Sequence, residues 1–233
     1  MRLIRLGIED LDRGLGGGIP HPSLVSVEGD HGSGKTVLTM KMVHSMLSEG
    51  LKVFVITSEA TVKEYLNMMR SIKLDAREAY LKGRLSIYPL HVEGGQWSRF
   101  LSSFFLKVAS SFLELNRRRF DAVVIDSLSV LTVDTPVHEL LTFITKMKNL
   151  ISDGKTVILT FHPGFLPEAS AMKLRASSDV YLTLSNARVS GINVKSLRIV
   201  KLWGSTGERV DSITLEVNPH LGLRVIPLGG VKL

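Results

Sequence analysis

Between residues 23 and 161, short apolar runs alternate with longer segments in which apolar residues recur every three or four positions. The apolar runs are bounded by glycine or polar residues and lie at 23–29, 52–57, 85–90, 121–127 and 156–161. Short continuous runs predict buried β-strands, and the longer segments between them predict helices. Because strands that alternate with helices form a mostly parallel sheet with helices on both faces, the pattern predicts an α/β fold.

Four segments have the helical period, and they lie at 35–50, 62–72, 97–119 and 135–154. In the first segment, one face carries Leu38, Met42, Val43, Met46 and Leu47. In the last segment, a single apolar stripe carries Val137, Leu140, Leu141, Ile144 and Ile151. Each stripe predicts the side of a helix that packs against the sheet.

After residue 161 the pattern changes, because apolar strands follow one another without helices between them. The candidate strands lie at 179–186, 196–204, 212–218 and 223–228. We expect them to be antiparallel strands added to the C-terminal edge of the same sheet. No repeat, low-complexity tract or linker divides the chain, so residues 1–233 are expected to form a single domain.

The composition is typical of a globular domain, with 44% hydrophobic and 22% charged residues. There is no cysteine, which excludes disulfides and thiolate metal sites. The start of the chain contains Glu9, Asp10 and Asp12 before any long apolar run, so a secretory signal is not expected. No run of about 18 apolar residues predicts a membrane span.

The net charge of +7 leaves nucleic acid, an anionic membrane face and an acidic partner open as ligands. The basic residues are scattered, which favours a solvated surface in which a nucleotide pocket accounts for part of the charge. One cluster, Arg117–Arg118–Arg119, lies at the end of a predicted helix, where the helix dipole favours cations without any ligand.

The segment GDHGSGKT, residues 29–36, has the G-x-x-x-x-G-K-T spacing of a phosphate-binding loop. A predicted strand precedes it and an amphipathic helix follows, which is the context that the motif requires. Glycines allow backbone N–H groups to surround a phosphate, and the helix N-terminus adds its positive end. We therefore predict a nucleotide-binding loop formed by Gly29, Asp30, His31, Gly32, Ser33, Gly34, Lys35 and Thr36. Lys35 would reach the β- and γ-phosphates, and the Thr36 hydroxyl would bind Mg²⁺.

A carboxylate ends the apolar run VVIDS, at Asp126. Such a carboxylate costs free energy unless a positive group lies nearby. Asp126 is therefore predicted to hold Mg²⁺, through a water molecule, although a role in capping a helix or forming a turn stays open.

Two glutamates are candidates for the base that activates water. Glu28 lies directly before the loop, and Glu59 lies two residues after the strand at 52–57. Glu59 is the better candidate for a catalytic base, because the end of its strand is expected beside the γ-phosphate, although a solvated loop carboxylate without a catalytic role stays open. Thr160 and His162, at the end of the last parallel strand, are candidates for sensing that phosphate. A histidine such as His162 is more often simply packed or solvent-exposed than a sensor of phosphate.

Three segments, in their order and spacing, resemble the RecA/KaiC-like ATPases: LDRGLGGGIPHPSLVSVEGDHGSGKT, VFVITSEATVKEYLNMMRSI and VVIDSLSVL. They are more similar still to one branch, the FlaH (ArlH) family of the archaellum, the archaeal flagellum. The segment YLKGRLSIYPLHVEGGQW, at 80–97, reinforces that branch. The likeness begins at about residue 5 and covers nearly the whole chain.

The resemblance implies a RecA-like P-loop NTPase core that binds ATP and Mg²⁺ and assembles as a six-membered ring with nucleotide near the subunit borders. It also implies a cytoplasmic protein, peripheral at the cytoplasmic face of the membrane, that docks on the motor ATPase FlaI. Its other partners would be a membrane platform protein and a scaffold. The role implied is regulation by bound ATP.

The chain departs from the family pattern at two catalytic positions. KaiC-like domains carry two adjacent glutamates after the second strand, and this chain has Ser58 and Glu59. They also present a Lys-x-Arg pair to the γ-phosphate of a neighbouring subunit, and here Lys201 remains while Trp203 takes the place of the arginine. A trans arginine contributes on the order of 10³–10⁵ in rate. Because that arginine is missing, at most slow ATP hydrolysis is expected, with Glu59 and Lys201 as the catalytic candidates; replacement of the arginine by Arg198 or Arg209 stays open.

Three hypotheses follow. The first is a ring subunit gated by nucleotide occupancy, with weak or no hydrolysis. The second is an active ATPase. The third is a recombinase-like DNA-binding protein, whose mobile basic loops would lie at 162–179 and 186–195; these segments hold few cations, so nucleic acid is not expected as a partner.

Overall fold

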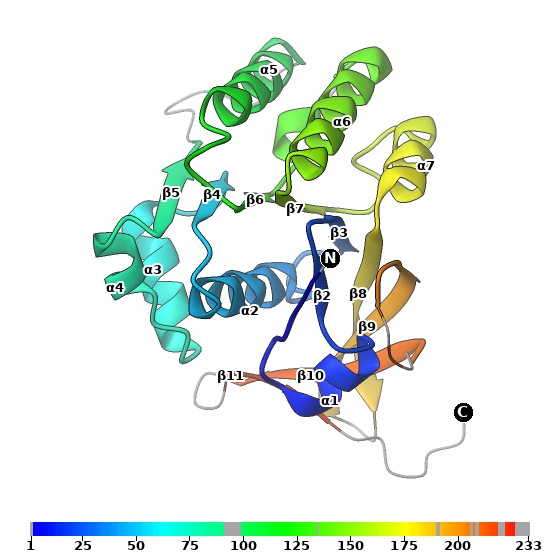
Figure 1. Ribbon diagram of the computed structural model, residues 1–233. Coiled ribbons are helices and arrows are strands. Elements are labelled where there is room, and N and C mark those ends of the chain that lie inside the picture. The colour runs from blue at the N-terminus through cyan, green and yellow to red at the C-terminus, as the bar shows by residue number, and fades with distance from the viewer. Residues whose placement is uncertain are drawn as a thin grey trace.

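A nine-stranded sheet forms the centre of the computed structural model (Figure 1). The structure describes residues 2–90, 99–133, 135–189, 192–205, 207, 210–218 and 222–226. The strand order across the sheet is β11-β10-β9-β8-β3-β7-β6-β4-β5. The strands are β3 (Leu24–Gly29), β4 (Val53–Thr57), β5 (Leu85–Pro89), β6 (Ala122–Asp126), β7 (Thr156–Phe161), β8 (Val180–Val189), β9 (Ile192–Leu202), β10 (Ser212–Asn218) and β11 (Gly222–Val225).

The five apolar runs between residues 23 and 161 form the strands β3 to β7, which pair only in parallel with one another. Every residue of β4, β6 and β7 is buried. Burial on both faces explains why these strands are continuous apolar runs rather than alternating ones. The predicted α/β class with a mostly parallel sheet is confirmed.

The strand β8 was predicted to be antiparallel, and that prediction is wrong. β8 pairs in parallel with β3, and only β9, β10 and β11 form the antiparallel extension. The reason is a crossover helix, α7 (Glu168–Ser177), which returns the chain to the starting end of the sheet after β7. Only Ser170 and Leu174 of α7 are buried, so its apolar pattern is too weak to predict a helix.

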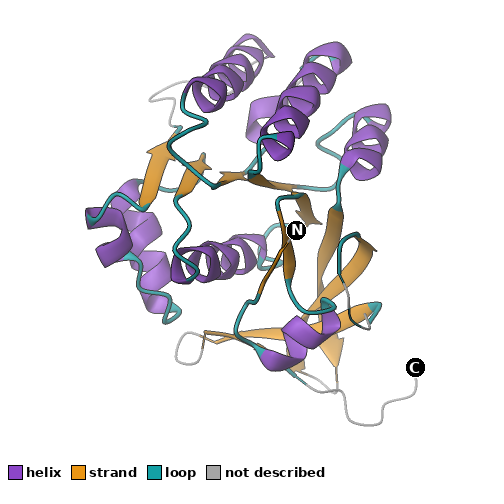
Figure 2. Ribbon diagram, in the orientation of Figure 1, coloured by secondary structure: helices purple, strands orange, loops and turns teal. Residues whose placement is uncertain are grey.

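The helices cover the two faces of the sheet (Figures 1 and 2). One face carries α2 (Lys35–Ser48), α3 (Val62–Ser71) and α4 (Arg77–Leu81), and the other carries α5 (Arg99–Leu115), α6 (Val137–Ser152) and α7. A short 3₁₀ helix, η1 (Val130–Thr132), follows β6. Each face has its own cluster of buried apolar side chains. The sheet therefore separates two cores, as expected for helices on both sides.

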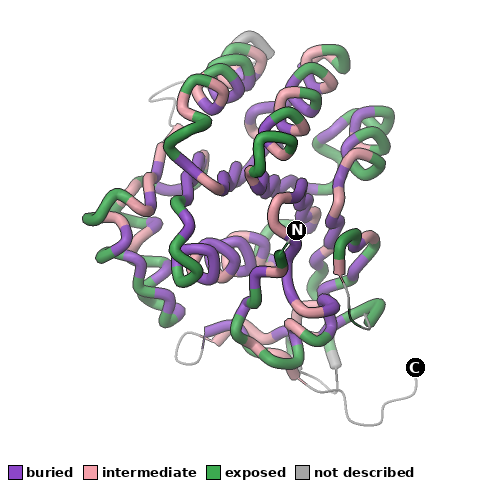
Figure 3. Tube along the Cα trace, in the orientation of Figure 1, coloured by how far each residue is buried: buried purple, intermediate pink, exposed green. Residues whose placement is uncertain are grey.

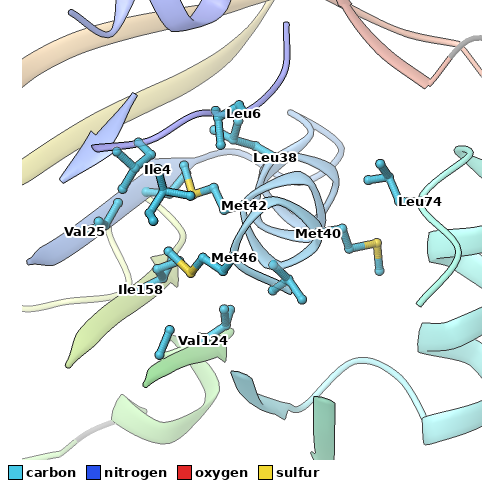
Figure 4. Close-up of a cluster of buried hydrophobic side chains, with 14 of the residues drawn as sticks. Ile4, Leu6, Val25, Leu38, Met40, Met42, Met46, Leu74, Val124 and Ile158 are labelled. Carbon is cyan, nitrogen blue, oxygen red and sulfur yellow. The ribbon is translucent and has the colours of Figure 1, made fainter. Parts of the chain in front are cut away.

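The helix α2 is buried around most of its circumference (Figure 3). The predicted face is buried, but so are Met40, Thr39 and Ser45 on other sides of the helix. Figure 4 shows the reason: Met42 and Met46 point toward strands of the sheet, Met40 points toward the side where Leu74 lies, and the N-terminal segment with Leu6 covers Leu38. The phosphate-loop helix is thus fixed from several directions.

Two other predicted helices need correction. In α6 the buried stripe consists of Leu140, Phe143, Ile144, Met147 and Leu150. Leu140 and Ile144 were predicted correctly, whereas Val137 is 39% exposed because the packed face begins one turn later. The helix α5 ends at Leu115 rather than at residue 119, and residues 97 and 98 lie outside the described part of the chain.

The two segments considered as mobile DNA-binding loops have regular structure. Residues 168–177 form α7, and residues 186–189 and 192–195 belong to the hairpin of β8 and β9. The described residues of these two candidate segments are therefore mostly helix and strand, not the loops that the DNA-binding hypothesis requires.

The start of the chain forms a small unit beside the antiparallel strands. It consists of β1 (Arg2–Ile4), α1 (Glu9–Gly14) and β2 (Ile19–His21), and β1 pairs with β2 in a separate sheet. The Asp12 carboxylate accepts hydrogen bonds from the backbone N–H groups of Leu6 and Gly7, at 2.6 and 2.9 Å. No helix in the described residues is long and apolar enough to cross a membrane.

Candidate functional site

The loop between β3 and α2 forms a tight backbone turn around the start of the helix. Gly32 and Gly34 have φ angles of +68° and +100°, in the left-handed region that glycine adopts without a steric penalty. Gly34 is the N-cap residue of α2, so the first N–H groups of a 14-residue helix open into the loop. The loop is therefore a nest of backbone donors at the positive end of a helix, which suits an anion.

Lys35 lies inside this loop and is 6% exposed. Its Nζ donates to the backbone carbonyl oxygens of Gly29, at 2.7 Å, and Asp30, at 2.9 Å. Burial lowers the pKa of Lys35, and the carboxylates of Asp126, Glu59 and Asp30 oppose that shift. The carbonyl oxygens are neutral acceptors, so an arriving phosphate would offer the ammonium a stronger, charge-assisted partner.

Asp126 ends β6 and lies beside the loop, as predicted. Its side chain is buried, and its Oδ1 accepts a hydrogen bond from the Thr160 hydroxyl at 2.5 Å. The Thr36 hydroxyl lies near this carboxylate and favours its ionised form. Burial raises the pKa of Asp126, while Thr160, Thr36 and the charge of Lys35 counteract the rise. The hydroxyl of Thr36 and the carboxylate of Asp126 thus form an oxygen donor pair of the kind that suits Mg²⁺.

The two candidate glutamates have different surroundings. Glu28 is held away from the loop, since its Oε2 accepts a hydrogen bond from the Tyr181 hydroxyl at 2.6 Å and lies 3.7 Å from the Arg175 guanidinium. Glu59 lines the same pocket as Lys35, and its pKa is raised by partial burial and then by the Asp126 carboxylate. Of the two, Glu59 is therefore the one with access to a ligand in the loop.

A cavity of about 370 Å³ opens over the loop. Six of its lining residues were predicted from the sequence: His31, Gly32, Gly34, Lys35, Thr36 and Glu59. His162 also lines it, from the end of β7. The lining further includes Val37 of α2, Lys195 of β9 and Val217 of β10, and the sequence analysis missed all three. The two distant residues reach the loop through the register of antiparallel strands, which no local pattern in the sequence specifies.

Two histidines meet at the rim of this cavity. The Nε2 atom of His162 lies 3.4 Å from Nδ1 of His31, and the two rings contact edge to face. Burial lowers the pKa of His162 to about 4, and the charges of Lys35 and His31 add to the effect. Its backbone N–H donates to the Ser129 hydroxyl at 2.8 Å. His162 is therefore a packed, neutral side chain at pH 7 that contacts the phosphate loop directly.

Acidification should destabilise the protein through His162. Its folded-state pKa of about 4 lies below the ordinary value of 6.5, so between these values the unfolded chain binds a proton that the folded chain does not. We expect the free energy of unfolding of wild type to fall from about pH 6.5 to about pH 4 more steeply than that of His162→Gln. Urea unfolding at several pH values measures both slopes, and parallel slopes would contradict the assignment.

Lys201 is not part of this pocket. It lies near the end of β9, opposite Tyr181 at the start of β8, whereas Gly29 of the phosphate loop pairs with Leu184, in the middle of β8. Its Nζ donates to the carbonyl oxygen of Ala176 at 2.8 Å. Its catalytic role therefore stays a prediction that requires the pocket of another subunit.

The residues considered for the position of the trans arginine lie in different surroundings. Trp203 is 67% exposed close to Lys201, Arg198 is exposed on the same strand as Lys201, and Arg209 lies outside the described residues.

Together, these features define a class of protein. A parallel strand leads through a glycine loop into a helix, with a lysine and a threonine at the helix start. A buried carboxylate ends the parallel strand β6, which lies two positions from β3 in the sheet, and this carboxylate interacts with that threonine. This arrangement defines a P-loop nucleotide-binding protein built on a RecA-like sheet.

Comparison with known proteins narrows the class. A sequence model of the KaiC ATPase family matches residues 4–229. The chain is 39% identical to the archaeal flagellar ATP-binding protein FlaH of Sulfolobus acidocaldarius over 226 residues, 97% of each chain. It is 27% identical to the FlaH protein of Methanocaldococcus jannaschii, over 97% of this chain and 96% of that one.

Solved structures agree with these sequence comparisons. The crystal structure of the flagellar accessory protein FlaH from Methanocaldococcus jannaschii matches with a TM-score of 0.82 at 25% identity, over 97% of this chain and 100% of that one. A KaiC-like protein from Pyrococcus horikoshii, 21% identical, shares the fold with a TM-score of 0.75 over 97% of this chain and 99% of that one. The chain therefore belongs to the FlaH family of KaiC/RecA-like ATPases, and the resemblance noted in the sequence is confirmed.

Proposed function

We propose that this chain is an ATP-binding regulatory subunit of the archaellum motor and assembly complex, and that its nucleotide occupancy controls docking on the motor ATPase FlaI. One observation carries the proposal: the groups expected to bind ATP and Mg²⁺ are all present, whereas some of the groups expected to catalyse hydrolysis are missing. Lys35, Thr36 and Asp126 meet at one loop. Glu59 is the single candidate base, and the neutral indole of Trp203 replaces the expected trans arginine.

Binding and turnover need different groups. The loop and its lysine can hold the phosphates of ATP, and Thr36 and Asp126 would hold Mg²⁺, the latter through water. When bound, Mg²⁺ would neutralise phosphate charge. Hydrolysis needs a placed base and a cation that stabilises charge developing on the transferring phosphoryl group. Because indole supplies no such charge, we expect bound ATP to persist and to act as a signal.

We further propose that residues 1–233 act as one RecA/KaiC-like domain that assembles as a ring, expected to be a hexamer. Its partners would be FlaI, a scaffold and a membrane platform protein, at the cytoplasmic face of the membrane. The support comes from FlaH relatives that align along 97% of this chain and that are described as archaeal flagellar ATP-binding proteins. Trp203, which is exposed directly after β9, is available to a neighbouring subunit together with the half-buried Lys201 beside it.

The test measures FlaI affinity with and without ATP and Mg²⁺, for wild type and for Lys35→Ala. ATP can shift docking only by as much as it prefers the docked state, so we expect about tenfold tighter FlaI binding for wild type and no ATP response for Lys35→Ala. By reciprocity, FlaI should tighten ATP binding by the same factor. Equal FlaI affinity for wild type and Lys35→Ala, each with and without ATP and Mg²⁺, would contradict the proposal. Lys41→Ala, elsewhere on α2, is the matched control.

The alternative function is an active ATPase, and the position of Glu59 in the pocket favours it. ATP hydrolysis by the purified ring at about 1 s⁻¹ or faster would favour that alternative, provided that Glu59→Gln loses this activity. Slower turnover beside tight ATP binding would favour regulation.

A further inference from the structure

A second lysine lies over the phosphate loop, contributed by the antiparallel extension. Lys195 of β9 is paired directly opposite Asn186 of β8. Its Nζ donates to the backbone carbonyl oxygen of Gly32 at 2.6 Å and to Asn186 Oδ1 at 2.5 Å. Its side-chain stem passes close to Gly34, where an added Cβ would lie 3.9 Å from Lys195 Cγ. The amine is thus held against the loop by two neutral acceptors.

The ammonium of Lys195 is solvent-exposed, as is usual for a lysine, but two hydrogen bonds fix its position. Lys195 lines the cavity over the loop together with Lys35, and the two amines donate to carbonyl oxygens of the same loop from two sides. Neither interaction of Lys195 is an ion pair, so its positive charge is not neutralised by these contacts. A polyphosphate bound in the loop would supply that negative charge.

We propose that Lys195 is a second phosphate-binding lysine, supplied from the same chain by the β8–β9 hairpin. On nucleotide binding, its amine exchanges the carbonyl oxygen of Gly32 for an oxygen of the polyphosphate, while Asn186 keeps the side chain in place. This inference rests on the proposed nucleotide binding and deepens it. It also means that nucleotide occupancy changes a contact between the loop and the hairpin.

A purely structural role is the competing explanation, because a cross-strand pair such as Lys195 and Asn186 stabilises a hairpin by itself. The variants Lys195→Gln and Lys195→Arg separate the two roles. Glutamine can still donate to Gly32 but has no charge, whereas arginine keeps the charge. Lys63→Ala, an exposed lysine on α3, is the control for general loss of positive charge.

The experiment is calorimetric titration of purified protein with ATP and ADP at low and physiological salt, combined with thermal unfolding without nucleotide. We expect Lys195→Gln to bind ATP about tenfold more weakly than wild type and with a weaker salt dependence, and Lys195→Arg to recover most of the affinity. Lys63→Ala should bind like wild type, and none of the variants should change the unfolding temperature of the free protein by more than a few degrees.

Two results would overturn the inference: unchanged ATP affinity of Lys195→Gln, or an equal loss of affinity in Lys195→Gln and Lys195→Arg. If wild type itself binds neither nucleotide, the proposed function fails as well. If wild type binds ATP and Lys35→Ala does not, while Lys195→Gln binds normally, only the inference about Lys195 fails.

Discussion

Replacing Gly29 with alanine is expected to abolish ATP binding and to lower the free energy of unfolding by about 2 to 4 kcal/mol. An added Cβ would lie 2.4 Å from the carbonyl oxygen of Leu184 and 2.6 Å from the Ser33 hydroxyl. Gly29 pairs with Leu184 in the parallel register of β3 and β8, so that oxygen is fixed within the central sheet. The loop would have to move away from the strand that positions it, and the backbone donors for phosphate would move with it.

Gly32→Ala is the matched control for this substitution. No atom lies within 4 Å of an added Cβ at Gly32, and the only penalty is its φ of +68°. That penalty is about 1 to 2 kcal/mol. Denaturant unfolding of the two variants, each with and without ATP, separates a steric conflict inside the sheet from a conformational cost in the loop. If Gly29→Ala were as stable as Gly32→Ala and still bound ATP, the close approach of β8 to the loop would not constrain the site.

The parts of the fold that the sequence predicts are those determined by local burial. The strands β4, β6 and β7 are buried on both faces, and each is therefore a continuous apolar run. The orientation of β8 depends instead on α7, which exposes Met172 and buries little. A helix held mainly by its position after β7 leaves a faint pattern in the sequence, so an antiparallel β8 was expected.

The same distinction applies to the candidate site. The phosphate loop is contiguous in the sequence, and Asp126 is identifiable as an acid at the tip of an apolar strand, so both could be found without a structure. Lys195 and Val217 are more than 150 residues from the loop in sequence and reach the pocket only through the pairing of β8, β9 and β10. Alternation along these strands shows which side chains share a face. It does not show which end of the strand lies beside the loop.

Replacing Lys35 with alanine is expected to weaken ATP binding at least about 100-fold, which corresponds to about 2.7 kcal/mol. Lys35 is the buried cation of the loop, and its ammonium has only carbonyl oxygens to exchange for phosphate. Fluorescence titration with an ATP analogue, or calorimetry, measures the loss. Lys41→Ala is the matched control, because Lys41 lies on the same helix and burial also lowers its pKa, but it lies beside Gly7 rather than in the pocket.

The free protein should show a second effect of Lys35→Ala. Burial raises the pKa of Asp126 above its ordinary value, and the charge of Lys35 opposes that rise, so removing Lys35 raises this pKa further. A carboxyl group with a raised folded-state pKa destabilises the protein as pH increases, because the unfolded chain ionises first. The unfolding free energy of Lys35→Ala should therefore fall more than that of Lys41→Ala as the pH rises above about 4, the ordinary pKa of an aspartate. Equal slopes in the two variants, with ATP affinity unchanged, would mean that Lys35 neither compensates Asp126 nor holds phosphate. Because the two effects share one cation, the charge that would bind the nucleotide also opposes the rise in the pKa of Asp126 and so favours the carboxylate form that Mg²⁺ would need.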